Sequence, residues 1–263
     1  MSVHYIVALF PGADPNKIYQ SSRSVFEAHT RAISASSSFS EISKVSFAVN
    51  MTDSHRHGPV VKKAFKDSIH GMRPKTQLVL RPNWGFSYGA WQDVIQSEAE
   101  ENYDFFLIES DYLPSGEFLA PFKAELTSDV GFVAQKISSA PSLHASVSNG
   151  YLSNSWAKMA IKSFGTVFSI YPFLLSRSDY MIGCENQLTF LNFIRELGGK
   201  ITEVNPNLSC LYWNSDLQKI IELGRSGGWA PIKPIQFGVD EYDLDTRQVF
   251  AQKAGDESRL FSE

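Results

Sequence analysis

Short apolar runs alternate with longer amphipathic stretches through the first half of the chain. Four runs are largely apolar and short enough for buried strands: residues 4–10, 44–50, 77–80 and 103–108. Between them, apolar residues recur at helical spacing, which predicts three helices: about residues 16–35, 58–72 and 87–101. Strands and helices that alternate at these intervals predict an α/β protein with a mainly parallel sheet.

The second half of the chain has a weaker pattern. A short strand is predicted over residues 129–136, and the Ser-rich segment 137–154 has no clear periodicity, which indicates a long loop. The apolar stretch 164–175 is rich in β-forming residues. A helix over 187–197, ended by two glycines, and a strand over 201–205 follow.

Two carboxylates stand at the end of the fourth apolar run, in the sequence YDFFLIESDYLP. They are Glu109 and Asp111, separated by Ser110. In an open α/β sheet, ligands bind at the carboxyl ends of the strands. Carboxylates placed against an apolar core are costly without a cationic partner, so this stretch favours a divalent metal site. The alternative is a surface turn with two solvated acids.

Composition removes several function classes. The chain has 263 residues, a net charge of -4 and a pI near 5.9, which argues against a broad basic surface for nucleic acid. Two cysteines are too few for a disulfide framework or a thiolate metal site. The first apolar run is too short for a signal peptide or a membrane span, so we expect a cytoplasmic protein.

Two motifs carry a family resemblance: RPNWGFSYGAW at residues 81–91 and FFLIESDY at residues 105–112. Together with the strand spacing, they resemble the nucleotide-sugar-dependent glycosyltransferases of the GT-A fold. In that family, an Asn-x-Gly-type turn and a helix precede a strand that ends in an Asp-x-Asp-like signature. The matching residues here are Asn83 and Gly85, and then Glu109, Ser110 and Asp111. The signature is Glu-x-Asp, which keeps oxygen ligands but leaves the role of Glu109 less defined.

The resemblance implies a single domain over residues 1–263 of GT-A type: a mostly parallel central sheet flanked by helices. Its Rossmann-like nucleotide-binding half covers 1–114, and an acceptor half with a C-terminal extension covers 115–263. The implied activity is metal-dependent, inverting transfer of a sugar from a nucleoside diphosphate sugar to a hydroxyl of a glycan or glycoconjugate. Asp111 would bind Mn²⁺ or Mg²⁺ directly, and Glu109 would bind the ion through water or hold the sugar or ribose.

The same resemblance assigns further residues to the donor site, at the ends of the first strands and beside the Asp-x-Asp-like signature: Leu9, Phe10, Pro11, Asn50, Asp53, Arg81, Asn83, Gly85 and Ser110. An inverting transfer also needs a base for the acceptor hydroxyl, for which Glu185 is the first candidate and Asp179 the second. The alternatives are ordinary strand-end residues, a surface arginine and a helix N-terminal acid.

Other candidate residues have weaker support. Asp243 and Asp245 spell Asp-x-Asp, but no apolar strand precedes them, which indicates a solvated acidic segment. His55 and His57 form a loop pair without an evident third metal ligand. Four aromatic residues either stack on a sugar or fill the core: Tyr151, Trp156, Tyr171 and Trp213.

Two other function classes remain open. One is a non-catalytic nucleotide- or glycan-binding module of the same fold. The other is a metal-dependent nucleotidyltransferase or phosphoester hydrolase, although the sequence PGADPNK after the first strand lacks a Gly-rich, basic signature. The sequence leaves the donor base, the sugar, the acceptor and the oligomeric state open.

Overall fold

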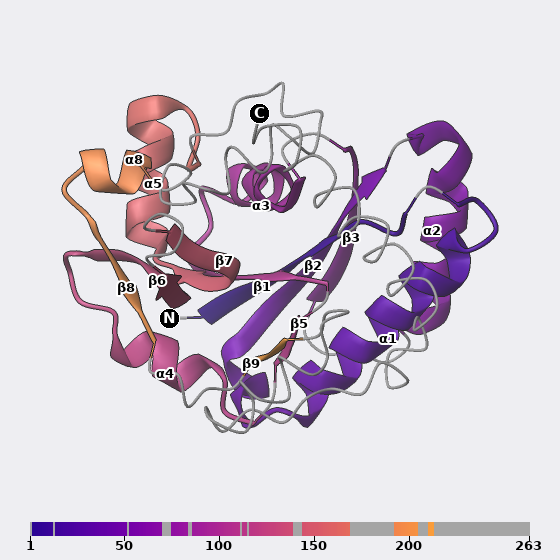
Figure 1. Ribbon diagram of the computed structural model, residues 1–263, viewed down its shortest axis with the longest axis horizontal. Coiled ribbons are helices and arrows are strands. Elements are labelled where there is room, and N and C mark those ends of the chain that lie inside the picture. The colour runs from indigo at the N-terminus through magenta and orange to yellow at the C-terminus, as the bar shows by residue number, and fades with distance from the viewer. Residues whose placement is uncertain are drawn as a thin grey trace, which may run out of the picture.

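The computed structural model centres on a seven-stranded sheet with the strand order β3-β2-β1-β4-β7-β6-β8 (Figure 1). The described residues are 2–12, 14–51, 53–69, 75–83, 86–110, 112–114, 116–138, 144–168, 192–204 and 210–212. None of the helices in these ranges is long and apolar enough to cross a membrane.

The first half forms the predicted alternation of strands and helices. Its elements are β1 (Ser2–Leu9), α1 (Ile18–Ala35), β2 (Ile42–Met51), α2 (Ser54–Ser68), β3 (Lys75–Pro82), α3 (Phe86–Ser97) and β4 (Tyr103–Glu109), with a 3-10 turn η1 (Ser37–Glu41) before β2. Strand β1 pairs in parallel with both β2 and β4, and β2 pairs in parallel with β3. The expected mainly parallel α/β sheet is confirmed.

Helix α2 begins four residues earlier than its apolar spacing predicts. The Asp53 side chain accepts a hydrogen bond from the Arg56 N–H at 3.0 Å, and this N-cap fixes the start of the helix. Pro59 therefore lies inside the helix, although Gly58-Pro59 resembles a helix boundary. The Asp53 cap therefore determines where the helix begins, and Gly58-Pro59 does not.

The second half adds further strands, only some of which the sequence predicts. After the short strand β5 (Tyr112–Pro114) and α4 (Leu119–Ala124), β6 (Val130–Ser138) pairs antiparallel with β7 (His144–Leu152). Strand β7 also pairs antiparallel with β4, and β8 (Lys200–Glu203) pairs in parallel with β6. Among the described strands of this sheet, β7 alone therefore runs against the common direction. Strand β5 pairs antiparallel with β9 (Cys210–Tyr212) in a separate small sheet.

The predicted long loop over 137–154 is wrong, because half of it, residues 144–152, is β7. Its Ser, Asn and Gly residues hide the strand, which is held by β4 on one side and β6 on the other. Gly150 is required there, because an added Cβ would lie 2.2 Å from Cζ of Phe132. The strand conformation of this segment is therefore determined by pairing with strands distant in sequence, and local propensity does not determine it.

The stretch 164–175, rich in β-forming residues, begins at the end of a helix. Helix α5 (Asn154–Phe164) ends at its first residue, and Gly165 follows in the left-handed region with φ 76°. Residues 169–191 lie outside the described ranges. The helix α8 (Asn192–Glu196) falls within the helix predicted over 187–197, and β8 falls close to the strand predicted over 201–205.

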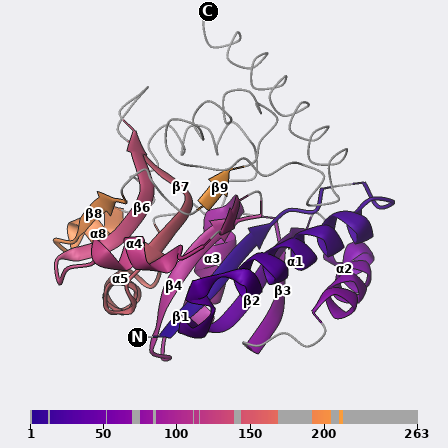
Figure 2. The ribbon, with the colours of Figure 1, turned by 90° about the horizontal axis from the view of Figure 1, so that it is seen from below.

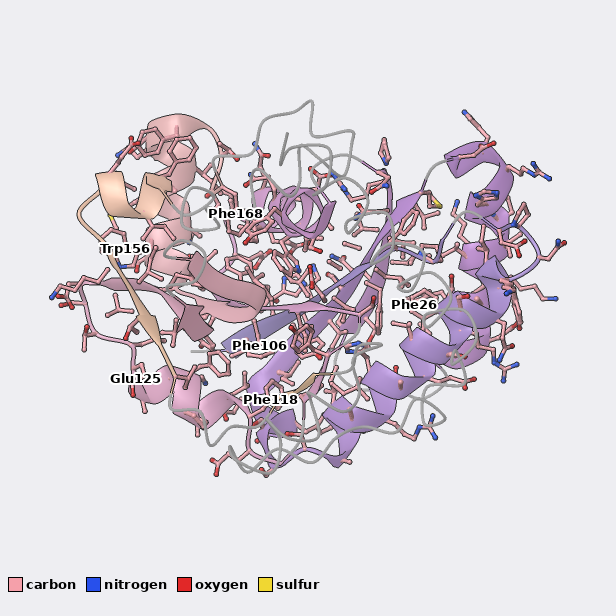
Figure 3. All side chains as sticks on the ribbon, viewed as in Figure 1. Phe26, Phe106, Phe118, Glu125, Trp156 and Phe168 are labelled. Atoms are coloured by element: carbon pink, nitrogen blue, oxygen red, sulfur yellow. The ribbon has the colours of Figure 1, made fainter. Side chains whose placement is uncertain are left out.

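Helices cover both faces of the sheet (Figures 1 and 2). Phe26 of α1, Phe106 of β4 and Phe118 belong to the core on one face, and the Phe106 and Phe118 ring centroids are 4.9 Å apart. Trp156 of α5 and Phe168 belong to the core on the face covered by α3 and α5 (Figure 3). The four residues 105–108 of β4 are at most 1% exposed, so this strand is buried on both faces, as its sequence predicts.

The β6–β7 hairpin continues past the end of β4. The last pair between β4 and β7 joins Ile108 to Asn149, whereas the pairs between β6 and β7 continue to Ser138 and His144. Residues 144–148 thus extend roughly 17 Å beyond that last pair, at the rise of an extended strand. We call residues 136–138 and 144–148 the hairpin arm (Figure 2).

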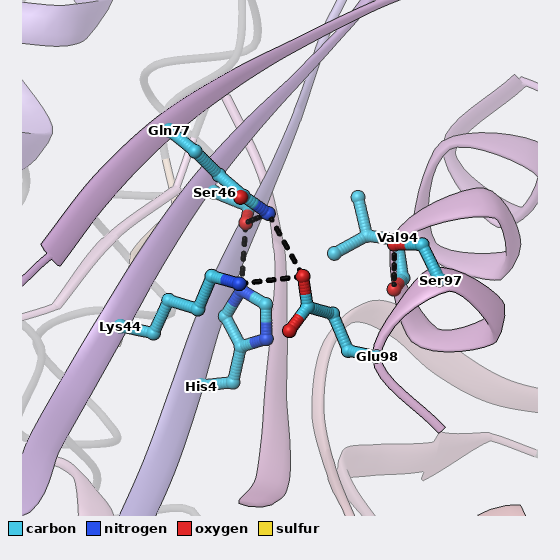
Figure 4. Close-up of polar contacts among 7 residues, drawn as sticks. All are labelled: His4, Lys44, Ser46, Gln77, Val94, Ser97 and Glu98. Atoms are coloured by element: carbon cyan, nitrogen blue, oxygen red, sulfur yellow. Dashed lines mark hydrogen bonds and ion pairs between the residues drawn. The ribbon is translucent and has the colours of Figure 1, made fainter. Parts of the chain in front are cut away.

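A buried polar cluster lies near the amino ends of the parallel strands (Figure 4). Its members are His4, Lys44, Ser46, Gln77 and Glu98. Lys44 Nζ is 2.5 Å from Glu98 Oε1, and Gln77 donates to Ser46 Oγ at 2.8 Å. His4 Nε2 is 2.6 Å from the same hydroxyl, while its Nδ1 has no hydrogen-bond partner among the described residues. Burial, with Lys44 as a smaller cause, lowers the pKa of His4 to about 3.

Candidate functional site

The strand order changes direction at β1. The chain moves outward from β1 to β2 and β3, and α3 then returns it to β4 on the other side of β1. Ligands of open α/β sheets bind beyond the carboxyl ends of the strands at such a switch point. Leu9 ends β1 and Glu109 ends β4, and the register pairs Ala8 with Glu109. The fold therefore brings the predicted residues Leu9, Phe10 and Pro11 beside Glu109 and Ser110.

We call residues 109–111 the acidic loop; Glu109 and Ser110 lie within the described ranges, and Asp111 lies outside them. Glu109 is half-buried and accepts a hydrogen bond from Ser87 Oγ at 2.5 Å. Ser87 lies in the first turn of α3, so the helix that follows β3 orients the carboxylate at the end of β4. The sequence contained Ser87 within the RPNWGFSYGAW motif but did not assign it this role.

The ends of β2 and β3 are joined by buried side chains. Arg81 donates from Nη1 to Asn50 Oδ1 and from Nε to Asp93 Oδ2, the latter at 2.6 Å. Asn50 is 4% exposed and Arg81 is 3% exposed. Burial lowers the pKa of Arg81, and Asp93 opposes that shift. These two predicted donor-site residues thus tie β2, β3 and α3 together, and a contact with the diphosphate remains a prediction.

The remaining donor-site predictions fall on the loops after β2 and β3. Asp53 is exposed and caps α2, and its hydrogen bond from Arg56 N–H lowers its pKa. The Asn83 N–H donates to the Met51 carbonyl at 3.1 Å, which holds the end of β3 beside the end of β2. Gly85, Asp179 and Glu185 lie outside the described residues.

A histidine that the sequence did not single out contacts the acidic loop. His29 of α1 is fully buried, with Nε2 3.3 Å from the Ser110 carbonyl and Nδ1 3.0 Å from the Tyr5 hydroxyl. Burial lowers the pKa of His29 to about 4, and the bond to Ser110 opposes that shift. The sequence showed His29 only as one position on the inward face of a helix.

Some candidate residues have structural roles instead. Tyr151 is completely buried and its hydroxyl donates to Asp104 at 2.9 Å, and Trp156 is 7% exposed in the core. Both side chains therefore fill the core, as one of the two alternatives for these aromatic residues expects. Tyr171, Trp213 and the Asp243–Asp245 segment lie outside the described ranges. No three His, Cys, Asp or Glu side chains come together as a metal site within the described residues, so the His55–His57 pair gains no third ligand there.

Comparisons with known proteins give similarities of fold. No protein-family model matches the chain, and no curated protein sequence matches it. Similar solved structures include the glycosyltransferase GlyE of Streptococcus pneumoniae, at 10% identity and a TM-score of 0.40, with 78% of this chain and 46% of GlyE covered. This chain thus spans less than half the length of GlyE.

Two further similar structures match along most of their length. The galactosyltransferase LgtC, in complex with donor and acceptor sugar analogues, is 7% identical with a TM-score of 0.43, and 89% of this chain and 100% of LgtC are covered. The 4-diphosphocytidyl-2C-methyl-D-erythritol synthase of Anaerococcus prevotii is 7% identical with a TM-score of 0.43, covering 77% of this chain and 88% of that one. Glycosyltransferases are therefore among the structures that this chain resembles in fold.

Proposed function

We propose that this protein is a metal-dependent glycosyltransferase of the GT-A type, which moves a sugar from a nucleoside diphosphate to a hydroxyl of a glycan or glycoconjugate. One observation carries the proposal: Glu109 ends the central strand β4, whose residues 105–108 are buried on both faces, at the switch point of the sheet. Ser87 holds this carboxylate, and the chain continues through Ser110 to a second acid, Asp111.

The donor atoms of the acidic loop suit a hard divalent cation. Carboxylate oxygens are the ligands that Mn²⁺ and Mg²⁺ prefer, and diphosphate oxygens complete such coordination. Asp111 and Glu109 would hold the ion, which stabilises the negative charge of a departing diphosphate. Ser87 would keep the Glu109 carboxylate oriented in the absence of the ion, because its hydroxyl already donates to Oε1.

The nucleoside of the donor is proposed to lie over the ends of β1 and β2. Phe10 would offer apolar surface to a base, and the exposed Asp53 would offer hydrogen-bond acceptors to a base edge or a ribose. Leu9, Pro11 and Asn50 are buried and would support these strand ends from within. The diphosphate would lie nearer the turn after β3, where Arg81, Asn83 and Gly85 follow each other closely in sequence. The half-buried Phe10 is the residue at the end of β1 that has surface left for such a contact.

The transfer itself forms one bond and breaks one. The oxygen of the acceptor hydroxyl bonds to the anomeric carbon, and the bond from that carbon to the diphosphate oxygen breaks, with its electron pair leaving on the diphosphate. The hydroxyl attacks the face of the sugar opposite the diphosphate, which gives inversion, and its proton passes to a carboxylate on that same face. Glu185 is the proposed base and Asp179 the second candidate.

Thermal unfolding with manganese and nucleoside diphosphates tests the donor site. A ligand at a hundred times its Kd stabilises a protein by about 2.7 kcal/mol, which for a chain of this size raises Tm by roughly 5 °C. Asp111→Ala should abolish that shift. Glu125→Ala is the matched control, because Glu125 is an exposed carboxylate at the end of α4 (Figure 3). An equal shift in Asp111→Ala and wild type would remove the metal assignment.

Product analysis then separates the function classes. A panel of nucleoside diphosphate sugars with manganese should give slow release of the nucleoside diphosphate, and Glu185→Gln should keep donor binding but lose transfer. Donor binding without release or transfer over a broad acceptor panel would indicate a binding module. Release of pyrophosphate from a nucleoside triphosphate and a sugar phosphate would indicate a nucleotidyltransferase.

A further inference from the structure

His29 reaches the acidic loop from a helix far away in sequence. It lies in the middle of α1, and its Nε2 is 3.3 Å from the carbonyl of Ser110, the central residue of the loop. The ring is held by its neighbours: its centroid is 6.0 Å from that of Tyr5 in β1 and 6.2 Å from that of Phe47 in β2. With the ring enclosed in this way, the direction of its nitrogens is fixed by packing.

The partners of the two nitrogens determine which one carries the proton. A carbonyl oxygen only accepts hydrogen bonds, so Nε2 must hold the hydrogen and donate it to Ser110. The buried imidazole is neutral at neutral pH, since its pKa is lowered to about 4. Its Nδ1 is then an acceptor, and the Tyr5 hydroxyl, 3.0 Å away, donates to it. A chain of donors therefore runs from Tyr5 through His29 to the loop.

Both main-chain polar groups of Ser110 are thereby held by core elements. Its N–H donates to the Ala8 carbonyl of β1 at 2.9 Å, and its carbonyl accepts from His29 of α1. These two bonds hold the backbone of Ser110, the central residue of the acidic loop, from two different elements of the core.

An apolar ring at position 29 would fill the same volume without the cost of burying two ring nitrogens. We propose that His29 is a positioning residue that holds the acidic loop in the orientation required to bind a divalent cation and a nucleoside diphosphate. This role rests on the proposed function. His29 acts through the Ser110 backbone, and the metal ligands remain Glu109 and Asp111.

Two substitutions of His29 separate its two hydrogen bonds. In His29→Gln, the amide nitrogen lies near the position of Nε2 and still donates to Ser110. In His29→Asn, the shorter amide lies near the position of Nδ1, where its oxygen accepts from Tyr5 but its nitrogen does not reach Ser110. Val25→Ala is the control, because Val25 is also buried on α1 and its side chain has no hydrogen-bonding group.

The first measurements need no ligand. In the wild type, ¹⁵N NMR of the imidazole should show the Nε2–H tautomer; the Nδ1–H tautomer would overturn the proposal without any variant. Amide exchange of the peptide containing residues 109–112 should rise at least tenfold in His29→Asn and stay within threefold of wild type in His29→Gln. In Val25→Ala, exchange of this peptide should also stay within threefold of wild type.

Manganese binding then tests whether the hydrogen bond from His29 to Ser110 supports metal binding. With uridine or guanosine diphosphate present, the Kd for Mn²⁺, measured by electron paramagnetic resonance, should rise at least tenfold in His29→Asn and less than threefold in His29→Gln. An equal rise of the Mn²⁺ Kd in His29→Asn and His29→Gln would refute a role for the hydrogen bond. The same rise in Val25→Ala, with a loss of Tm equal to that of His29→Asn, would also refute it. If the wild type binds no manganese while the exchange results hold, the proposed function fails and His29 only anchors the loop.

Discussion

The buried His4 makes the stability of this protein depend on pH in a direction that can be calculated. His4 is completely buried at the amino edge of the sheet, where Lys44 of β2 and Glu98 after α3 belong to the same polar cluster. Its pKa falls from 6.5 to about 3 on folding, mainly because of burial. A proton on this ring would be buried beside the Lys44 ammonium. Acid therefore favours the unfolded chain, in which the ring is in water.

The magnitude follows from the two pKa values. At pH 5, an imidazole with the unfolded value of 6.5 is protonated about thirtyfold over its neutral form, whereas folded His4 is almost entirely neutral. The ratio corresponds to about 2 kcal/mol of stability lost between pH 7.5 and pH 5. The loss begins as the pH falls through 6.5, and the contribution is fully present above that value. Its size is insensitive to the native pKa as long as that pKa lies well below the pH of the measurement.

Urea unfolding at about pH 7.5, 6 and 5, followed by tryptophan fluorescence, measures this contribution in His4→Gln and in wild type. The variant keeps an amide near Ser46 but has no titrating ring, so its stability should fall by about 2 kcal/mol less than that of wild type. Other groups, His29 among them, titrate in both proteins and cancel. His55→Gln, which removes an exposed imidazole of α2, is the control variant. Parallel pH curves for His4→Gln and wild type would show that His4 is not buried in its neutral form.

Two other substitutions test the packing around β7. Gly150→Ala places a methyl group 2.2 Å from the Phe132 ring, and we expect a loss of about 1–3 kcal/mol in urea unfolding; an unchanged midpoint would show that this close approach is not present. Tyr151→Phe removes a donor from the buried Asp104, which still accepts from the Asn154 N–H at 2.9 Å, and should cost about 1–3 kcal/mol; a neutral result would place water beside Asp104.

The sequence predicts the first half of the fold well because each element there has a local signal. Residues 105–108 have no polar alternation and become the part of β4 that is buried on both faces, and helical spacing identifies α1 and α3. Strand β7 has no such signal. Its strand state comes from hydrogen bonds to β4 and β6, and its Gly150 leaves room for a ring on the neighbouring strand.

The candidate site also contains residues with a local sequence signal and residues without one. Glu109 and Ser110 are found by the rule that ligands bind at strand ends, which needs only the strand and the residues directly after it. Ser87 and His29 contact the acidic loop from 22 and 81 positions away in sequence. Such contacts depend on how α3 and α1 pack on the sheet, which the spacing of apolar residues does not reveal.

The length of the hairpin arm is independent of the strand pairing that positions Glu109. Its residues pair with each other beyond the last pair of β4 and β7, so changing its length leaves the position of Glu109 unchanged. It rises from the same edge of the sheet as the acidic loop, because β6 runs in the direction of β4. A shorter or exchanged hairpin arm would therefore change how far this part of the sheet extends beside the acidic loop, while the fold stays the same. Proteins of this fold with different arms would share this edge of the sheet and differ in the molecules that fit beside it.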